Sequence, residues 1–194
     1  MASKYGNLDK ISTTGASVTT GRQDGENIAG IAASEKLART DLGRMNKYKG
    51  TIQSVSVETG MDGAIIAGII SRESRAGNVL DSRKYGDHGN AFGLMQIDIR
   101  YHTPRGDWKS ENPRDWNNKV HILQCTQILA SMFTAIHQKF PGFTKEDQMK
   151  GALAAYNAGP GNVTNLHDPD SRTTGKDYSN DVVARAKFFK RRGF

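Results

Sequence analysis

The stretch AIIAGIISRESRAG, residues 64–77, carries an apolar run that ends close to a single glutamate, Glu73. Helical side chains advance by about 100° per residue, so residues three and four apart share one face. One face of this segment therefore carries, in order, Ile66, Ile69, Ile70 and Glu73. The pattern predicts a helix whose last turns direct a carboxyl group toward the side on which the isoleucines are buried.

A carboxyl group in apolar surroundings behaves differently from one in water. Desolvation disfavours its ionised form and raises its pKa, so it can donate a proton near neutral pH, as a general acid must. Arg72 and Arg75 project from other sides of the same helix and need not neutralise Glu73. The pattern alone leaves an alternative open, in which the glutamate turns outward or pairs with an arginine.

The surrounding sequence predicts a mostly helical fold. Asp62 is a good N-cap for the helix that contains Glu73, and Gly77 is its expected end. Residues 81–108 are dense in turn formers, and AFGLMQIDI within them predicts one short β-hairpin. Apolar spacing and caps predict further helices at residues 33–56, 119–140, 144–159 and 177–194. We therefore expect an α+β fold that is predominantly α-helical, with a small hairpin region.

The domain organisation follows from composition. Residues 1–30 are rich in Gly, Ser, Thr and Asn, which is typical of loops, and we expect a loop-rich arm packed on the domain. Residues 31–194 contain no internal repeat and no linker, so we expect one domain there. No run approaches the roughly 18 to 20 apolar residues of a membrane helix, and MASKYGNLDK lacks the apolar core of a signal peptide. We expect no membrane insertion and leave the localisation open.

The net charge and the residues that could bind a metal limit the classes of function that the chain could have. The 27 Lys and Arg against 20 Asp and Glu give a net charge of +7, which favours polyanionic partners such as nucleic acid, anionic lipid or bacterial wall polymers. The single cysteine, Cys125, excludes an intrachain disulfide and lies in an apolar helical pattern, where a buried thiol is expected. The histidines are scattered without an H-E-x-x-H motif, and GPGNV lacks the rest of a dinucleotide-binding motif. We therefore expect neither a metal nor a cofactor.

A glycosidase needs a second carboxylate besides its acid, to activate water or to act as nucleophile. The segment after Glu73 offers four aspartates: Asp81, Asp87, Asp98 and Asp107. Asp87 lies in YGDHGNAFG, where glycines permit tight turns, and Asp98 ends the expected hairpin. Each aspartate alone is more often a turn former or a surface charge. Together with Glu73 they form a candidate set of catalytic carboxylates.

Four blocks of the chain resemble goose-type lysozymes in order and spacing. They are AGIISRESRAG, YGDHGNAFGLMQID, GALAAYNAGPGNV and DYSNDVVARAKFF. ES, GLMQ and AYNAG are also shared with bacterial lytic transglycosylases, whereas IISRES and DVVARA are specific to the goose type. The resemblance implies a lysozyme-like fold with a cleft. It also implies hydrolysis of the β-1,4 bond between N-acetylmuramic acid and N-acetylglucosamine in peptidoglycan, with inversion at the anomeric carbon.

The resemblance assigns roles at matching positions. The glutamate of RES corresponds to the family's general acid, Glu73, and the aspartates of GD and QID correspond to its water-positioning acids, Asp87 and Asp98. Five residues are implied in or near the glycan cleft: Gln96, His102, Tyr156, Asn157 and Tyr178. Three of them have ordinary alternatives, Tyr156 as a core residue, Asn157 as a helix cap and His102 as a surface residue. The implied partners are peptidoglycan and chitin-like N-acetylglucosamine oligomers, and the implied role is antibacterial defence by a monomer that binds no nucleic acid.

The chain departs from avian members of the family, which carry disulfide-forming cysteines in the N-terminal half. The matching stretches here contain Lys4, Val18, Ala29 and Gly60, which resembles the fish branch. The family implies extracellular or phagolysosomal action, and without a leader, cytoplasmic residence or leaderless release stays open. The sequon at Asn162 matters only on the secretory route.

Three other functions remain alternatives. A lytic transglycosylase uses the same acid but closes the sugar on itself, and Asp87 and Asp98 favour hydrolysis because only hydrolysis needs a water-activating carboxylate. Glu73 argues against a wall-binding module without activity. A nucleic-acid binder is suggested only by the net charge and the tail KFFKRRGF, with no base-reading motif.

Overall fold

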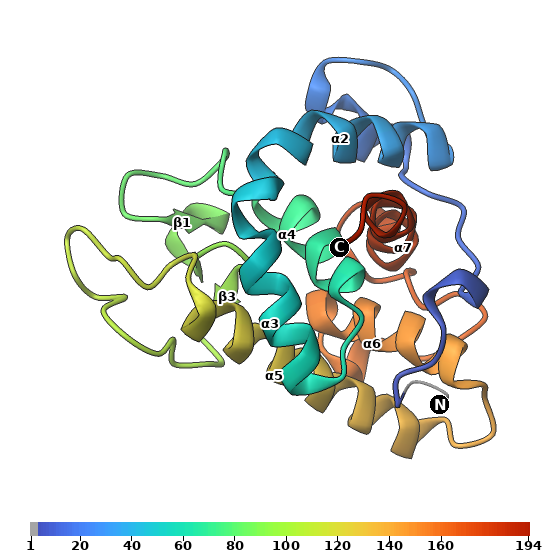
Figure 1. The fold of residues 1–194 in the computed structure, drawn as a ribbon. Helices are drawn as coiled ribbons and strands as arrows, with labels where there is room; N and C mark the ends of the chain where they lie inside the picture. Colours follow the sequence, from blue (N-terminus) through green and yellow to red (C-terminus); the bar gives the residue numbers. More distant parts are fainter. Residues whose placement is uncertain (1–3) are drawn as a thin grey trace.

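The computed structural model describes residues 4–194, which form an α+β fold dominated by helices, as expected (Figure 1). The α-helices are α1 (Val18–Gly21), α2 (Gly30–Met45), α3 (Lys49–Thr59), α4 (Gly63–Ser74), α5 (Lys119–Lys139), α6 (Lys145–Ala158) and α7 (Tyr178–Lys190). The strands β1 (Tyr85–Gly86), β2 (Ala91–Phe92) and β3 (Ile97–Asp98) form one antiparallel sheet. The sheet and its loops project on one side of the helical body.

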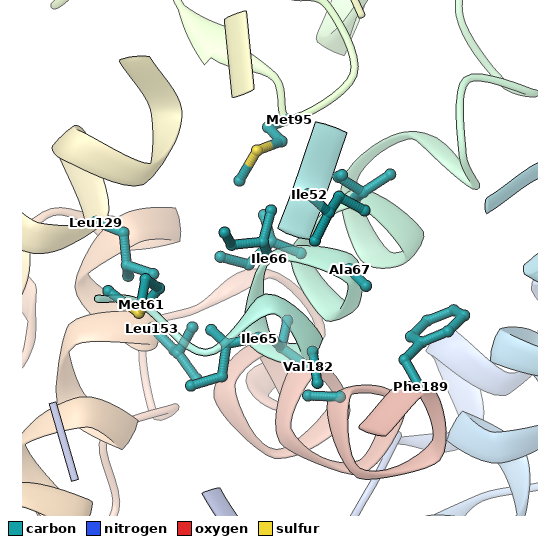
Figure 2. Close-up of a cluster of buried hydrophobic side chains, with 14 of the residues drawn as sticks. Ile52, Met61, Ile65, Ile66, Ala67, Met95, Leu129, Leu153, Val182 and Phe189 are labelled. Atoms are coloured by element: carbon teal, nitrogen blue, oxygen red, sulfur yellow. The ribbon is translucent and has the colours of Figure 1, made fainter. Parts of the chain in front are cut away.

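Helix α4 is the centre of the hydrophobic core. Every residue from Gly63 to Ser71 is buried, and its isoleucines contact side chains from the surrounding helices (Figure 2). The approach of α7 is especially close at Gly68, where a Cβ atom would lie 2.8 Å from the carbonyl oxygen of Val182. Since backbone atoms cannot yield as a flexible side chain can, this glycine sets the distance between α4 and α7.

The expected limits of α4 were right at one end and wrong at the other. Asp62 caps the helix, and its Oδ1 accepts a hydrogen bond of 2.9 Å from the backbone N–H of Ala64. The helix ends at Ser74 rather than near Gly77, because Arg75 and Ala76 adopt left-handed backbone conformations. Ion pairs from Arg75 to acidic groups elsewhere stabilise this early end, and no local pattern signals them.

The single helix expected over residues 33–56 is two helices. A 3-10 turn, Asn46–Tyr48, separates α2 from α3. The turn lets α2 pack on α7 while α3 packs on α5, which one straight helix would not allow. No proline marks this turn, and the apolar spacing of Met45, Tyr48 and Ile52 continues through its polar residues.

The other caps agree with expectation. Thr144 Oγ1 accepts a hydrogen bond of 3.1 Å from the N–H of Asp147 at the start of α6, and Gly159 follows its end. Lys187 and Lys190 lie in the last turn of α7, where positive charge complements the helix dipole.

The expected hairpin is present and gains a third strand. Its register pairs Gly86 with Ala91 and Ala91 with Asp98, so these residues form one row across the sheet. Asp87 follows β1 directly. The pairing therefore brings Asp87 and Asp98, eleven positions apart in the sequence, to the same end of the small sheet, on its two outer strands.

Residues 4–29 lie against the helical body and form few regular elements. Besides α1, they contain the 3-10 turns Leu8–Lys10 and Arg22–Asp24. Thr13 Oγ1 donates a hydrogen bond of 2.5 Å to the carbonyl of Asn180 on α7. Whether these residues are a separate arm stays a prediction. Across residues 4–194, no helix combines the length and apolar character needed to cross a membrane.

Candidate active site

Glu73 lies in the last turn of α4, where its side chain is partly buried. Its Oε1 accepts a hydrogen bond from the hydroxyl of Tyr178 at the start of α7. Burial raises the pKa of Glu73 to about 7, although the Tyr178 hydrogen bond and the charge of Arg72 act in the opposite direction. The negative charge of Asp87 adds to the rise. A large fraction of Glu73 is therefore protonated near neutral pH and able to donate.

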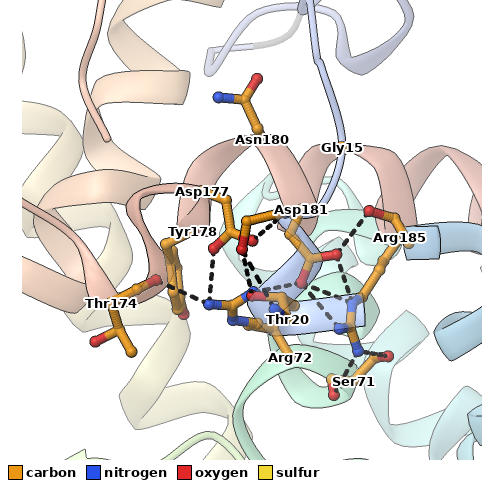
Figure 3. Close-up of polar contacts among 12 residues, drawn as sticks. Gly15, Thr20, Ser71, Arg72, Thr174, Asp177, Tyr178, Asn180, Asp181 and Arg185 are labelled. Atoms are coloured by element: carbon orange, nitrogen blue, oxygen red, sulfur yellow. Dashed lines mark hydrogen bonds and ion pairs between the residues drawn. The ribbon is translucent and has the colours of Figure 1, made fainter. Parts of the chain in front are cut away.

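A polar network between α4 and α7 fixes the surroundings of Glu73 (Figure 3). Arg72 donates to Asp181 at 2.7 Å and to Asp177 at 3.0 Å, two carboxylates that flank Tyr178 in the sequence. The two ion pairs fix the register of α4 against α7, and this register brings the Tyr178 hydroxyl to Glu73. As expected, Arg72 forms its ion pairs with other groups, although its charge still acts to lower the pKa of Glu73.

Arg75 also has partners of its own. Its Nε lies 2.9 Å from Asp41 Oδ1, and its Nη2 lies 2.9 Å from Asp24 Oδ1. Both arginines beside Glu73 are thus neutralised by aspartates from other elements. The acid keeps the raised pKa that an arginine pairing directly with it would abolish.

Asp87 and Asp98 lie on either side of one guanidinium group. Arg100 donates from Nε to Asp98 Oδ1 at 2.9 Å and from Nη2 to Asp98 Oδ2 at 2.6 Å. The same Nη2 lies 3.7 Å from Asp87 Oδ2. The Arg100 hydrogen bonds hold the pKa of Asp98 below its usual range. Both aspartates are partly open to solvent, with side chains 56% and 31% exposed, so water reaches them.

Left-handed backbone conformations cluster around these carboxylates. Asp87, His88 and Gln96 have φ values of 46°, 54° and 56°. Such conformations cost free energy in residues with side chains, and proteins keep them mainly at functional sites. The strain aims Asp87 out of the strand direction and turns the chain before β3.

Gln96 is held within the hairpin. Its Nε2 donates to the carbonyl of Gly93 at 2.8 Å, and a Cβ atom at Gly86 would lie only 2.2 Å from its Oε1. The absence of a side chain at Gly86 therefore makes room for the glutamine. Below this loop, the buried His121 accepts a hydrogen bond of 3.0 Å from the N–H of Met95, and burial lowers its pKa to about 3. His121 is therefore neutral and keeps accepting that bond over most of the pH range.

A cavity of about 570 Å³ lies where the sheet region meets α5 and α6. Four of the five residues expected in the glycan cleft line it: Gln96, His102, Tyr156 and Asn157. Asp98 and Arg100 line it too, while Tyr178 contacts Glu73 instead. The cavity therefore gathers side chains from segments more than fifty residues apart in the sequence.

Tyr156 is not only a core residue, and Asn157 is not a helix cap. Tyr156 packs against the core yet lines the cavity, and its hydroxyl donates to the carbonyl of Met95 at 2.9 Å. Asn157 does not cap α6, because its Oδ1 accepts from the N–H of Thr174 at 2.9 Å. Both side chains connect the cavity wall to neighbouring loops.

Comparison with known proteins identifies the family of the chain. The sequence model of the family Lysozyme g matches residues 5–193. The chain belongs to the goose-type lysozyme family. It is 48% identical to Lysozyme g of Struthio camelus over 98% of this chain and 89% of the relative. Fish relatives are equally similar, with Lysozyme g of Cyprinus carpio 48% identical over all of both chains and that of Epinephelus coioides 47% identical over 98% and 99%.

Membership of the goose-type family confirms the resemblance of the sequence motifs. The chain is therefore a lysozyme, a glycoside hydrolase that degrades bacterial peptidoglycan, with an antibacterial function. Family membership does not test the roles of individual residues, which stay predictions at Glu73, Asp87 and Asp98.

Among the residues of this lysozyme's cavity that the sequence did not single out, Arg100 and Tyr101 have the side chains best suited to a role in the site. Arg100 follows Asp98 by two positions, and an arginine there is typical of a surface charge. Tyr101 is 81% exposed and lines the cavity, a position in which an aromatic ring can stack on a sugar face. Tyr101 stood in a turn-like segment without any periodicity, so only the folded structure relates it to the cavity. The thiol of Cys125 is buried, as expected, and burial raises its pKa, so it is no nucleophile.

Proposed function

We propose that this lysozyme cleaves the β-1,4 bond between N-acetylmuramic acid and N-acetylglucosamine by an inverting mechanism. Glu73 protonates the glycosidic oxygen as general acid, and a water held by Asp87 and Asp98 attacks the anomeric carbon from the opposite face. The bond to the leaving sugar breaks as the bond to water forms, and the aspartates accept the proton of that water. The observation that carries the proposal is the contrast between a carboxyl group with pKa near 7 and two solvent-accessible aspartates that flank a cation.

The two environments suit two different tasks. A general acid works best when its pKa lies close to the working pH, which holds for Glu73. A carboxylate that receives a proton must be ionised first, and Arg100 favours the ionised form of Asp98. In such enzymes the acid and the base are usually two carboxyl groups whose pKa values differ.

The cavity side chains support a sugar ligand. Tyr156 and His102 offer flat rings, and Asn157 and Gln96 offer amides that match hydroxyl and acetamido groups. We propose that these four residues bind the glycan of peptidoglycan. Chitin-like N-acetylglucosamine oligomers should fit the same cavity, because they contain N-acetylated sugar rings as that glycan does. Tyr178 acts on the acid rather than on the sugar.

The test compares conservative variants on soluble oligomers and on peptidoglycan. Glu73→Gln keeps the shape but cannot donate a proton, so we expect roughly 10²- to 10⁴-fold slower turnover with the fold retained. Asp87→Asn and Asp98→Asn should each cost less than Glu73→Gln, and the double variant more than either single one.

Glu58→Gln is the matched control, because Glu58 is an exposed glutamate that pairs with Lys119 on the surface. It should turn over substrate at the parent rate. Parent-like activity of Glu73→Gln would remove the acid from the mechanism. Mass spectra of the products that show mainly 1,6-anhydro sugars would indicate transglycosylation instead of hydrolysis.

A further inference from the structure

Arg100 interacts with both Asp98 and Asp87, and with Asp98 through several hydrogen bonds. Besides the two side-chain hydrogen bonds to Asp98, its backbone N–H donates to Asp98 Oδ1 at 2.9 Å. The guanidinium also reaches toward Asp87 at 3.7 Å while remaining 54% exposed. An exposed ion pair contributes little to stability, so this arrangement has little value for the fold. Two parallel hydrogen bonds from one guanidinium group do, however, fix the orientation of the carboxylate plane.

We propose that Arg100 is a positioning residue for the attacking water: it fixes the carboxylate of Asp98 and holds Asp87 and Asp98 beside one another at one end of the sheet. The inference rests on the proposed function, since it assumes that these aspartates hold the water. Arg100 itself acts through Asp98 and need not touch the substrate.

Counting acceptor positions indicates which oxygen of Asp98 is free to accept a hydrogen bond from the water. Each carboxylate oxygen has two lone pairs. Asp98 Oδ1 accepts from both the backbone N–H and the Nε of Arg100, so it is saturated. Oδ2 accepts only from Nη2 and retains one position. The same Nη2 faces Asp87 Oδ2, so the free lone pair of Asp98 and the carboxylate of Asp87 are both close to one guanidinium nitrogen.

A positive charge beside the two aspartates favours their ionised forms. Two carboxylates that share a site repel each other, and the repulsion raises the pKa of one of them unless a positive charge compensates. The groups that face the pair are Arg100 and His102 on the loop after β3, Asp87 on the turn after β1, and Glu73 on α4, which Asp87 influences. Arg100 forms the hydrogen bonds and His102 contributes more weakly. Without Arg100, Asp98 loses the hydrogen bonds and the charge that most favour its ionised form.

The first experiment measures kcat, KM and the pH dependence of kcat/KM for Arg100→Ala and Arg100→Lys on a soluble N-acetylglucosamine oligomer. A misplaced reacting group costs up to about 100-fold in rate, so we expect Arg100→Ala to lower kcat about 10- to 100-fold with little change in KM. The acid limb of its pH profile should move to higher pH, because the ionised form of Asp98 loses its stabilisation. Arg100→Lys keeps the positive charge but cannot donate two parallel hydrogen bonds to Asp98. Its acid limb should therefore lie close to that of the parent, whereas its kcat should stay below the parent value.

Arg105→Ala is the control, an exposed arginine on the same loop outside the cavity lining, and it should behave as the parent. Melting temperatures should be alike for all three variants, because the side chains are on the surface. Parent-like kcat and pH profile in Arg100→Ala would overturn the inference.

A double-mutant cycle with Asp98→Asn decides whether Arg100 acts through Asp98. In that background we expect Arg100→Ala to cost less than about twofold, because the carboxylate it positions is gone. An equal loss in both backgrounds would overturn the positioning role. If Asp98→Asn alone had parent activity, the proposed function of the aspartates would fail, and any loss in Arg100→Ala would then also contradict action through Asp98.

Discussion

At the scale of the residue, the surroundings of one carboxyl group, that of the proposed general acid Glu73, set its pKa. Glu73 is partly buried at the end of an apolar helix, beside two arginines that are neutralised by other partners. Burial dominates over the Tyr178 hydrogen bond, so the pKa rises to about 7 rather than falling. The same group near a free arginine would be a carboxylate at neutral pH, without a proton to donate.

The pH dependence of activity follows from this balance. A general acid is active while protonated, so activity should fall as pH rises through about 7. The Tyr178 hydroxyl favours the ionised form of Glu73, and Tyr178→Phe should therefore raise the pKa of Glu73 and move the basic limb to higher pH. Profiles of kcat/KM for parent and variant measure the shift. A basic limb that moved to lower pH, or stayed in place, would show that the hydrogen bond does not control this proton.

At the scale of the element, helix α4 is defined by both its sequence and its neighbours. The spacing of its isoleucines and the Asp62 cap are local features, and both were predictable. Its early end was not, because the left-handed Arg75 is stabilised by Asp24 and Asp41, which lie far away in the sequence. The turn between α2 and α3 has the same kind of cause, since packing on two different helices decides it.

The residues of the candidate site also differ in how far the sequence alone could identify them. Helical periodicity predicted that Glu73 lies on the buried side of its helix, whereas its proposed role as the acid came from the resemblance. Asp87 and Asp98 could be separated from the other aspartates only through the resemblance. Arg100 was missed because its proposed role depends on the sheet register that brings two aspartates to one end of the sheet. Residues related by distance in space leave no local pattern in the sequence.

Contact between α4 and α7 gives a test at this scale. Gly68→Ala adds a Cβ atom 2.8 Å from the Val182 carbonyl oxygen, which should destabilise by about 1 to 3 kcal/mol despite the better helix propensity of alanine. Gly43→Ala in α2 meets nothing within 4 Å and should stabilise by about 0.5 to 1 kcal/mol. Urea denaturation measures both variants. A Gly68→Ala protein as stable as Gly43→Ala would show that the helices separate without cost.

At the scale of the whole molecule, positive charge matters for reaching the substrate. The net charge of +7 attracts an anionic bacterial wall over distances that salt screens, about 8 Å at physiological ionic strength. We expect lysis of intact cells to slow as salt rises, while cleavage of a short neutral oligomer changes little. Equal salt dependence for both substrates would mean that steering contributes nothing.

The central claim is hydrolysis with inversion, which the configuration of the fresh product tests most directly. An inverting enzyme leaves room for water between its carboxyl groups, which stand about 6.5 to 9.5 Å apart, and water then attacks from the face opposite the leaving group. Proton NMR recorded during the first minutes of chitin-oligomer digestion, before mutarotation, reports the new anomer. We expect the α-anomer from the β-1,4 bond. A fresh β-anomer would contradict inversion, and a product without a reducing end would contradict hydrolysis itself.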